Sequence, residues 1–575
     1  MKKILLVILM IVLTLGFASC NNEKFTNPGD SLGGGEEVTD VPSVPDTSSV
    51  DEFEYVEKDI DTNISYSETD VFINLSDNNT VIENNNSVTV SNNIITISKI
   101  GTYVFSGKLS NGRIYVNLDG NVHLVFNNVD IKSNDGSPLV IMGKKAKSLT
   151  LVKDSNNRLE DSSSYEVFYN TDNDEPNGAL FSKKALTING SGNLSVIGNY
   201  NNGISVKDTL KIIDASVTVV ASNNGIKGND QVIIKDATVN ISSNGDGIKS
   251  DNEDSAETGI VYIENSKLTI DSDEDGIQAF NLLEIKGGKA DITTFGGVDE
   301  KKTTEDSAKG LKSDGNIVLH SGTFTLNNYD DAVHSAKTLK ILDGTYDIKT
   351  KDDGIHSDDI LEISGGTITI SKSYEGLEAA KVIINGGTIS IVASDDGINA
   401  SDGTETKMGK SNPNCQITIN GGNVTVNASG DGIDSNGTIV ISGGVVVVYG
   451  PTTNNDGSLD ADGGILVNGG TVIALGTLGM VETPGSNSLQ NVVSIAFSKQ
   501  QSANRNVVIK DKDGKEIMNI DSLKNFQSLI FSSVNLINGD KYKIYVDGTL
   551  AEEFSQTSVI TYVGSTGRPG GNRPR

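Results

Sequence analysis

The stretch Asp246-Gly247-Ile248-Lys249-Ser250 carries a short phrase that recurs along the middle of the chain. The phrase consists of an acid, Gly, Ile or Leu, a variable residue, and Ser or Ala. Close copies occupy 275–279, 309–313, 353–357, 375–379, 396–400 and 431–435, and looser copies begin at Asn202, Asn224, Asp331 and Asp456. Six of the ten intervals between successive copies are 21 or 22 residues long. A fixed period of this length indicates a solenoid of stacked units.

Each unit reads as three short strands of alternating pattern separated by Gly or Asx turns. In one unit the expected strands are 360–363, 367–370 and 376–379. Twenty-two residues rising roughly 3.3 Å each complete one triangular coil, and stacking pairs each strand with its counterpart one coil on. The chain lacks the Leu ladder and Asn pattern of leucine-rich repeats, and its period exceeds that of nonapeptide calcium rolls. The sequence therefore predicts an all-β fold, a parallel β-helix with coils of about 22 residues.

The segments outside the regular repeats have different patterns. Residues 58–200 contain strand-like runs without a strict period, so we expect an N-terminal cap and irregular first coils before the regular β-helix of 201–484. Residues 485–563 alternate like strands and predict a small C-terminal β-sandwich-like cap. Residues 21–57 hold ten acids against one Lys and predict a disordered linker. The tail 564–575 is expected to be disordered as well.

The first twenty residues are typical of a secretory signal. Lys2 and Lys3 precede an apolar run over 4–15, and small residues then lead to Cys20 as in a bacterial lipoprotein signal. This pattern predicts lipidation of Cys20 and a protein tethered in the cell envelope, outside the cytoplasm. The alternative is ordinary signal-peptidase cleavage, in which Cys20 has no role.

Composition narrows the classes of partner. The 575 residues include 76 acids and 46 Lys or Arg, a net charge of −30, with 62 Gly and no Trp. Such an acidic chain is not expected to bind nucleic acid, which requires clustered Lys and Arg. Cys20 and Cys415 cannot supply a disulfide framework. We expect a monomer.

The variable position of the phrase should face outward, since side chains in a strand alternate between the two faces. Stacked coils would align these residues in one row, the outward ladder. In order it contains Ser205, Lys227, Lys249, Gln278, Lys312, His334, His356, Glu378, Asn399, Asp434 and Asp460. We take Lys227, Lys249, Gln278, Lys312, His334 and His356 as candidate substrate-binding residues. The alternative is a solvated sheet face with ordinary scatter of charge.

The residue before the Gly is acidic in eight of eleven copies of the phrase. Carboxylates stacked about 4.8 Å apart repel one another unless they are bridged, and Ca²⁺ favours such oxygen-rich sites. The alternative is that Asp before Gly is simply favourable turn chemistry. The candidate calcium ligands are Asp246, Asp251, Asp273, Asp275, Asp331, Asp353, Asp396, Asp431 and Asp434.

Three insertions lie next to the outward-facing strands. The extra residues at 251–258 and 401–414 follow such strands, and those at 297–308 precede one. Loop variation on a rigid scaffold is a common way of building a binding site. The first insertion adds Asp251, Asn252, Glu253 and Asp254 beside Lys249, so the stretch 246–314 is the expected centre of the site.

Three motifs resemble a family of secreted carbohydrate-binding β-helix proteins: 185–192 (ALTINGSG), 198–204 (GNYNNGI) and 245–252 (GDGIKSDN). The resemblance covers about residues 60–560. It implies a right-handed parallel β-helix like that of the pectate lyases. It also implies calcium binding and an association with cellulose and polygalacturonate.

A comparison with pectate lyases of the family-nine type implies further roles. By the spacing of their motif, Asp246, Asp273 and Asp275 correspond to calcium ligands, and Lys312 corresponds to the catalytic base. Gln278 stands where another Asp is expected, and Glu274 interrupts the acidic pair. These departures weigh against lyase catalysis.

Three functions remain open from the sequence. The first is a lipid-anchored binding protein for plant cell-wall polysaccharide, either an acidic glycan such as pectin or cellulose, that depends on Ca²⁺. The second is a calcium-dependent polysaccharide lyase that cleaves uronic-acid polymers by β-elimination. The third is a surface adhesin or spacer in which the repeats only supply length.

Overall fold

The computed structural model describes residues 63–85, 87–143, 145, 147–166, 175–404 and 410–564. All of these lie in one compact unit, 45–575. The predicted signal, Cys20, the linker 21–57 and residues 565–575 lie outside the described residues. Among the described residues, no helix has the length and apolar character needed to cross a membrane.

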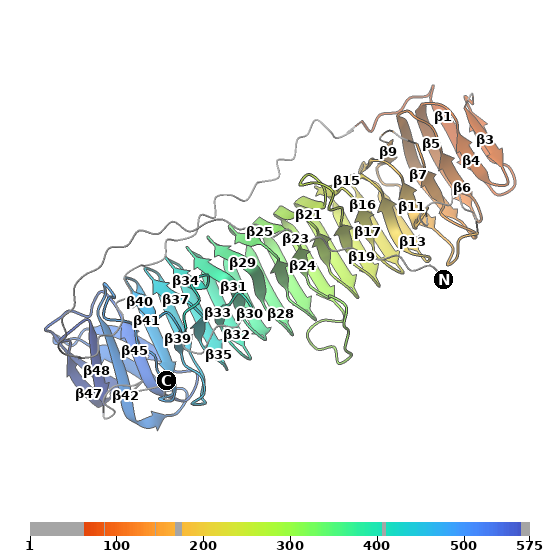
Figure 1. The fold of residues 1–575 in the computed structure, drawn as a ribbon. Helices are drawn as coiled ribbons and strands as arrows, with labels where there is room; N and C mark the ends of the chain where they lie inside the picture. Colours follow the sequence, from red (N-terminus) through yellow and green to blue (C-terminus); the bar gives the residue numbers. More distant parts are fainter. Residues whose placement is uncertain are drawn as a thin grey trace, which may run out of the picture. The chain divides into compact units, whose positions relative to one another are not determined.

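The described chain is built from β-strands, and most of them pair in parallel with the equivalent strand of the next coil. Figure 1 shows this for β28, β30, β32 and β35, which follow one another side by side. The predicted all-β, parallel and β-helix-like architecture is therefore confirmed. Three parallel sheets run through the coils, one for each strand of the predicted unit.

The first sheet carries the repeated phrase and is called the ladder sheet. Its strands, in spatial order, are β4 (Ile94–Ile97), β6 (Arg113–Val116), β8 (Leu139–Ile141), β11 (Gly178–Ser182), β14 (Asn202–Val206), β17 (Ile226–Gly228), β20 (Ile248–Ser250), β22 (Ile277–Ala279), β24 (Leu311–Ser313), β26 (Val333–Ser335), the starts of β29 (Ile355–Ile363) and β31 (Leu377–Ile384), β33 (Ile398–Ala400), β36 (Ile433–Ser435) and β39 (Leu459–Ala461).

The second sheet follows the ladder sheet in each coil. It contains β1 (Val71–Leu75), β5 (Gly101–Leu109), β7 (Val122–Lys132), β9 (Lys147–Leu151), β12 (Leu186–Asn189), β15 (Thr209–Ile213), β18 (Gln231–Lys235), the starts of β21 (Ile260–Ser272), β23 (Leu282–Thr294) and β25 (Asn316–Asn328), then β27 (Thr338–Ile341), the ends of β29 and β31, β34 (Gln416–Ile419), β37 (Thr438–Ile441) and β40 (Ile465–Val467).

The third sheet closes each coil. It contains β10 (Asn156–Glu160), β13 (Asn193–Gly198), β16 (Ser216–Ala221), β19 (Thr238–Ser243), the ends of β21, β23 and β25, then β28 (Thr345–Thr350), β30 (Thr367–Ser373), β32 (Thr388–Ala393), β35 (Asn423–Ala428), β38 (Val445–Tyr449) and β41 (Thr471–Gly476).

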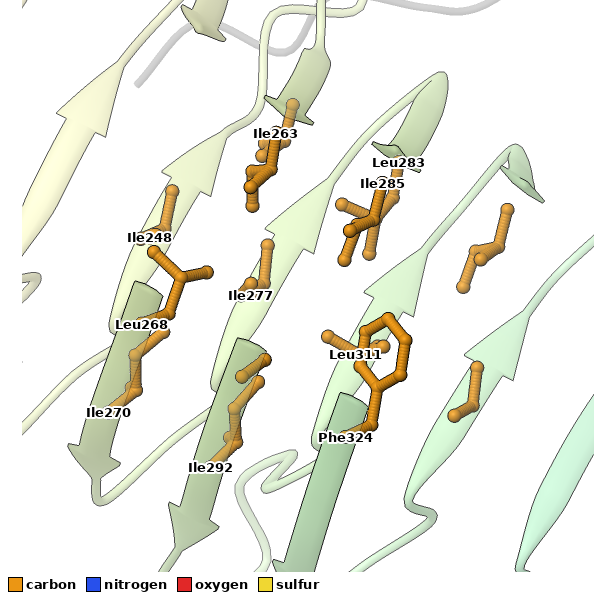
Figure 2. Close-up of a cluster of buried hydrophobic side chains, with 14 of the residues drawn as sticks. Ile248, Ile263, Leu268, Ile270, Ile277, Leu283, Ile285, Ile292, Leu311 and Phe324 are labelled. Carbon is orange, nitrogen blue, oxygen red and sulfur yellow. The ribbon is translucent and has the colours of Figure 1, made fainter. Parts of the chain in front are cut away.

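Aliphatic side chains from all three sheets fill the interior. Ile248, Ile277 and Leu311 are register partners on adjacent strands of the ladder sheet and are fully buried. Figure 2 shows them in file, opposite Ile270 and Ile292 of the third sheet. Because each coil places like residues above like residues, the core extends as continuous aliphatic rows that need few aromatic side chains.

The two ends of the described chain contain antiparallel pairs. At the N-terminal end β2 (Val81–Glu83) pairs with β1, and β3 (Val88–Ser91) pairs with β4. At the other end β45 (Phe526–Ser532) pairs antiparallel with both β41 and β42 (Val492–Gln501), whereas β48 (Ile560–Gly564) pairs with β42 in parallel. A separate four-stranded sheet has the order β44 (Glu516–Asp521), β43 (Asn506–Lys510), β46 (Lys541–Val546) and β47 (Thr549–Ser555). A second apolar cluster, which includes Val507, Phe531 and Tyr542, lies here.

Candidate functional site

The strand register confirms that the predicted ladder residues align in one row, of which the first, Ser205, is fully buried. From Ser205 to Asp460, each member is the direct Cα partner of the next. The residues on either side of a ladder residue are buried, as in β20, where Ile248 and Ser250 flank the partly exposed Lys249. All six candidate substrate-binding residues therefore lie in one line on one face of the ladder sheet.

A second row runs beside the ladder and contains the residues before the Gly; it is called the acid row. One oxygen of each aspartate in the row accepts a hydrogen bond from the backbone of the next coil, whereas Glu375, within the described residues, accepts only from the Asn399 side chain and its Oε2 has no hydrogen-bond partner. Asp246 Oδ1 accepts from Asp275 N at 3.1 Å, and Asp353 Oδ1 accepts from Glu375 N, also at 3.1 Å. The row thus satisfies backbone donors that would otherwise be buried without partners. This capping explains why an acid or Asn recurs at the position.

The other carboxylate oxygen of the acid row faces the ladder. Asp246 Oδ2 lies 2.6 Å from the Lys249 ammonium, and Asp275 Oδ2 lies 3.1 Å from that of Lys312. Burial would lower the pKa of Lys249, but the charge and hydrogen bond of Asp246 raise it above its ordinary value. In these coils an ammonium therefore occupies the place beside the carboxylate that a metal ion would need.

Two histidines follow Lys312 on the ladder. His334 Nδ1 lies 2.9 Å from Asp331 Oδ2, and His356 Nδ1 lies 3.2 Å from Asp353 Oδ2. Burial would lower the pKa of His356, but its hydrogen bond to Asp353 and the charge of Asp331 raise it to about 9. Lys309 also contacts Asp331, at 2.5 Å, so the carboxylates of these coils are balanced by cations.

Beyond His356 the ladder and the acid row are acidic apart from the neutral Asn399 and Gly457. Within the described chain, Glu375, Asp396, Asp431 and Asp434 have no basic side chain at ion-pair distance. Burial, together with neighbouring carboxylates, raises the pKa of Asp396 to about 6, of Asp431 to about 7 and of Asp434 to about 8. Negative charge is therefore uncompensated at this end of the ladder.

Oxygen atoms converge at the same end. Asp431, Asp434 and Asp460 each offer a carboxylate oxygen, and these atoms lie within 4.8 Å of one another. Asn399 is the ladder neighbour of Asp434 and is 9% exposed. Its amide donates to Glu375 Oε1 at 3.2 Å, whereas its buried Oδ1 has no hydrogen-bond partner. A hard cation such as Ca²⁺ takes six to eight oxygen ligands of these types, so the donor set fits one.

Two insertions reach the ladder. In the first, Asp251 contacts the Lys227 ammonium at 2.6 Å. In the second, Ser307 Oγ donates to Asp275 Oδ1 at 2.7 Å and accepts from Lys312 at 3.3 Å. The insertions therefore fix the orientation of ladder cations from both ends of the strands.

Other predicted residues are placed differently. Asp273 is exposed on the turn before the acid row. Asp456 lies one residue before the row, because the register sets Gly457 opposite Asp431: Asp431 Oδ1 accepts a hydrogen bond from Gly457 N. Two tyrosines have aromatic or cationic neighbours: Tyr200 is stacked on Tyr165, and the Lys351 ammonium lies 4.0 Å from the Tyr329 ring centre.

Sequence reasoning left Glu375, Asn399 and Asp460 out of its candidate ligands. The available signal was the change of the ladder from cations to acids after His356. The aligned copies of the phrase contain that change, but the insertions favoured a binding site in the stretch 246–314.

The chain is similar to proteins of a known family. The profile of a family described as "Carbohydrate-binding domain-containing protein" matches residues 91–354 and 350–491. A protein of the same description from Acetivibrio thermocellus is 34% identical over 126 residues, which are 22% of this chain and 44% of the relative. The chain thus matches less than half the length of that relative.

A solved structure is also similar. It is the gadolinium derivative of the polysaccharide lyase-like protein from C. thermocellum, with 29% sequence identity and a TM-score of 0.40. The match covers 44% of this chain and 96% of that chain. Because the family profile spans more than half of the residues, the chain belongs to the family of carbohydrate-binding domain-containing proteins.

Proposed function

We propose that the protein is a calcium-dependent binding protein for acidic plant cell-wall polysaccharide, such as polygalacturonate, and that the outward ladder is its binding surface. The observation that carries the proposal is the polarity of the ladder: a line of cations runs directly into an uncompensated cluster of acids. A polymer that bears carboxylates can contact the first part through ammonium groups and the second part through a bound cation.

The cationic part offers a regular spacing. Lys227, Lys249, Gln278 and Lys312 are consecutive ladder residues on β17, β20, β22 and β24. Strands of one sheet lie about 4.8 Å apart, close to the length of one pyranose residue. A glycan that lies along the ladder would therefore meet a donor side chain at nearly every sugar. Cellulose could use the same donors through its hydroxyl groups, but it has no carboxylate to pair with the lysines.

The proposed calcium site is at the acidic end. Asp396, Asp431, Asp434, Asp460 and the Oδ1 of Asn399 would hold the ion. When bound, Ca²⁺ would neutralise the buried carboxylates and offer open coordination positions to a glycan carboxylate. The ammonium groups beside Asp246 and Asp275 make those coils less suitable for a cation than the acidic end.

The proposal also includes location. A lipid on Cys20 would tether the protein at the cell envelope, and the acidic linker 21–57 would hold the binding surface away from the membrane. Radiolabelled-palmitate incorporation that disappears in Cys20→Ser would support the tether. Equal incorporation in the variant would contradict it.

Affinity electrophoresis tests the binding function. The full chain should be retarded in gels that contain polygalacturonate when Ca²⁺ is present, and retardation should fall sharply with a chelator. The double variant Lys227→Gln/Lys249→Gln should lose most of the retardation. Lys340→Gln, a change on the second sheet, serves as the matched control. Equal mobility with and without polygalacturonate would refute the proposal.

A second candidate function rests on the position of Lys312. Its ammonium is held at the middle of the ladder by Asp275 and Ser307. As a base, Lys312 would have to leave this ion pair, lose the extra proton of its ammonium group to solvent and then, as a neutral amine, remove the C5 proton of a uronate. The C4–O bond would then break, a C4=C5 double bond would form, and the departing oxygen would take a proton.

Release of unsaturated uronate is followed by ultraviolet absorbance. A lyase would give rising absorbance that Lys312→Ala abolishes. If absorbance stayed constant on several uronate polymers that the protein still binds, the lyase function would be refuted and only the binding function would remain.

A further inference from the structure

The two ladder histidines form an unusual pair. They are direct register partners on β26 and β29, and their ring centroids lie 4.7 Å apart. Both rings turn Nδ1 toward the acid row and Nε2 toward Asp358, which follows His356 by two residues on β29. His334 Nε2 lies 3.6 Å from Asp358 Oδ1, and His356 Nε2 lies 3.5 Å from the same oxygen.

The distances from the two Nε2 atoms to Asp358 are longer than the distances from the two Nδ1 atoms to their nearest acid-row oxygens. The Nδ1 contacts with Asp331 and Asp353, at 2.9 and 3.2 Å, are of hydrogen-bond length. The Nε2 contacts are longer than a hydrogen bond. In a tetrahedral zinc site with Zn–N bonds of about 2.0–2.1 Å, neighbouring ligand atoms lie about 3.3 Å apart. The separations from Asp358 Oδ1 are close to that edge length.

The Nδ1 contacts supply a second feature of metal-binding histidines. A ligating imidazole usually donates its other N–H to a carboxylate, which fixes the tautomer and the ring orientation. The buried Asp331 takes this role for His334, and His356 Nδ1 lies 3.2 Å from Asp353 Oδ2 and 3.3 Å from Glu378 Oε2. His356, whose pKa is raised to about 9, has to release its Nε2 proton when it binds a metal ion. The lone pair of the neutral ring is then on Nε2 and faces Asp358.

We propose that His334, His356 and Asp358 form a binding site for a divalent transition-metal ion of the Zn²⁺ class. Two imidazole nitrogens and one carboxylate oxygen suit zinc, whereas the all-oxygen acidic end suits calcium. The Asp358 side chain is 53% exposed, so a fourth position remains open to solvent. The site lies on the ladder between the cationic part and the acidic end, and it does not depend on the proposed glycan binding.

Calorimetric titration tests the proposal on the full chain without a polyhistidine tag. The protein is first stripped of metals and then saturated with Ca²⁺, so that the acidic end is filled before zinc chloride is added. We expect one equivalent of zinc to bind. His334→Gln, His356→Gln and Asp358→Asn should each weaken binding at least tenfold.

Matched controls are available for both residue types. Asp359→Asn removes the neighbouring exposed acid, and His320→Gln removes a histidine of the second sheet; both should leave the zinc affinity within twofold. Replacing zinc by Co²⁺ should give the intense visible bands of a four-coordinate ion, and Asp358→Asn should change them. Circular dichroism verifies the fold of each variant.

Two results would overturn the proposal. One is the absence of zinc binding under these conditions. The other is unchanged affinity in Asp358→Asn, the variant least able to disturb folding because its side chain is exposed. Loss of calcium-dependent glycan retention would refute the proposed function and leave this result unaffected, so the two failures are distinguishable.

Discussion

At the scale of single residues, the acid-row carboxylates Asp246, Asp275, Asp331 and Asp353 each have two tasks. One oxygen caps a backbone N–H of the next coil, and the other meets a basic ladder residue of the same or the next coil. Asp246 does both, with Asp275 N and with the Lys249 ammonium. The identity of the ladder residue therefore decides whether the carboxylate is neutralised by the protein itself or left for an external cation.

Asp434→Asn tests this division at the acidic end. Burial and the charges of Asp431, Asp396 and Asp460 raise the pKa of Asp434 to about 8, so its ionised form destabilises the calcium-free protein. We expect the variant to raise the melting temperature in a chelator and to weaken calcium binding by at least about tenfold, because ligand charge sets affinity. Differential scanning calorimetry and calcium titration measure the two effects.

Asp271→Asn is the control for this change, since it removes an exposed acid from β21. It should alter neither quantity appreciably. If Asp434→Asn lowered the melting temperature in a chelator and left calcium affinity unchanged, the acidic end would be a structural cluster and not a calcium site.

At the scale of elements, the Gly of the phrase lets adjacent layers approach closely. A Cβ on Gly247 would lie 2.4 Å from Ile270 Cγ2 and 2.5 Å from the carbonyl oxygen of Gly276. The first contact is with the third sheet and the second is with the next coil. The missing side chain thus allows the turn before each ladder strand to pack against the core.

Gly247→Ala should therefore destabilise the protein, at a cost of about 1–3 kcal/mol typical of overpacking. Part of the clash is with backbone, which cannot move aside cheaply. Gly485→Ala is the matched control, because its Cβ would meet other atoms only at 3.6 Å or more. Thermal unfolding compares the two variants, and equal melting temperatures would show that the coils can relax around the added methyl group.

Much of the ladder sheet could be predicted from the sequence. The period fixed which strand lies beside which, and alternation fixed which side chains face outward, so the whole ladder from Ser205 to Asp460 followed from counting. Local pairing was harder to predict. The contact of Asp246 with Lys249 depends on how the turn directs the Asp246 side chain. The extra residue that places Gly457, and not Asp456, opposite Asp431 could be recognised only from the observed strand register.

At the scale of the whole described chain, the net negative charge is distributed unevenly along the ladder sheet. Coils from β20 to β29 pair their acid-row aspartates with Lys or His, whereas coils from β31 to β39 place acids in one or both rows and have no Lys or His in either row. Charge balance in the later coils depends on protons or on a bound cation. The stability of the molecule should therefore respond jointly to pH and calcium.

In a chelator, the free energy of unfolding should fall as pH rises from about 5 to 9. Burial and neighbouring acids raise the pKa of Glu375 to about 9 and of Glu378 to about 7, and Asp396, Asp431 and Asp434 are raised too. The folded state therefore binds more protons than the unfolded state in this range, and stability decreases with pH. His356, with its pKa raised to about 9, acts in the same direction.

Two further effects shape the expected dependence of stability on pH. Burial would raise the pKa of Asp331, but His334 and Lys309 lower it overall, so its opposing slope is confined to pH values below about 4. Calcium binds the ionised carboxylates, so its stabilising effect should be larger at pH 8 than at pH 5.5. Melting temperatures measured across this range, with chelator and with Ca²⁺, should diverge as pH rises. Parallel curves would mean that the acidic end binds no calcium, and the ladder would then have to recognise its glycan through its cations alone.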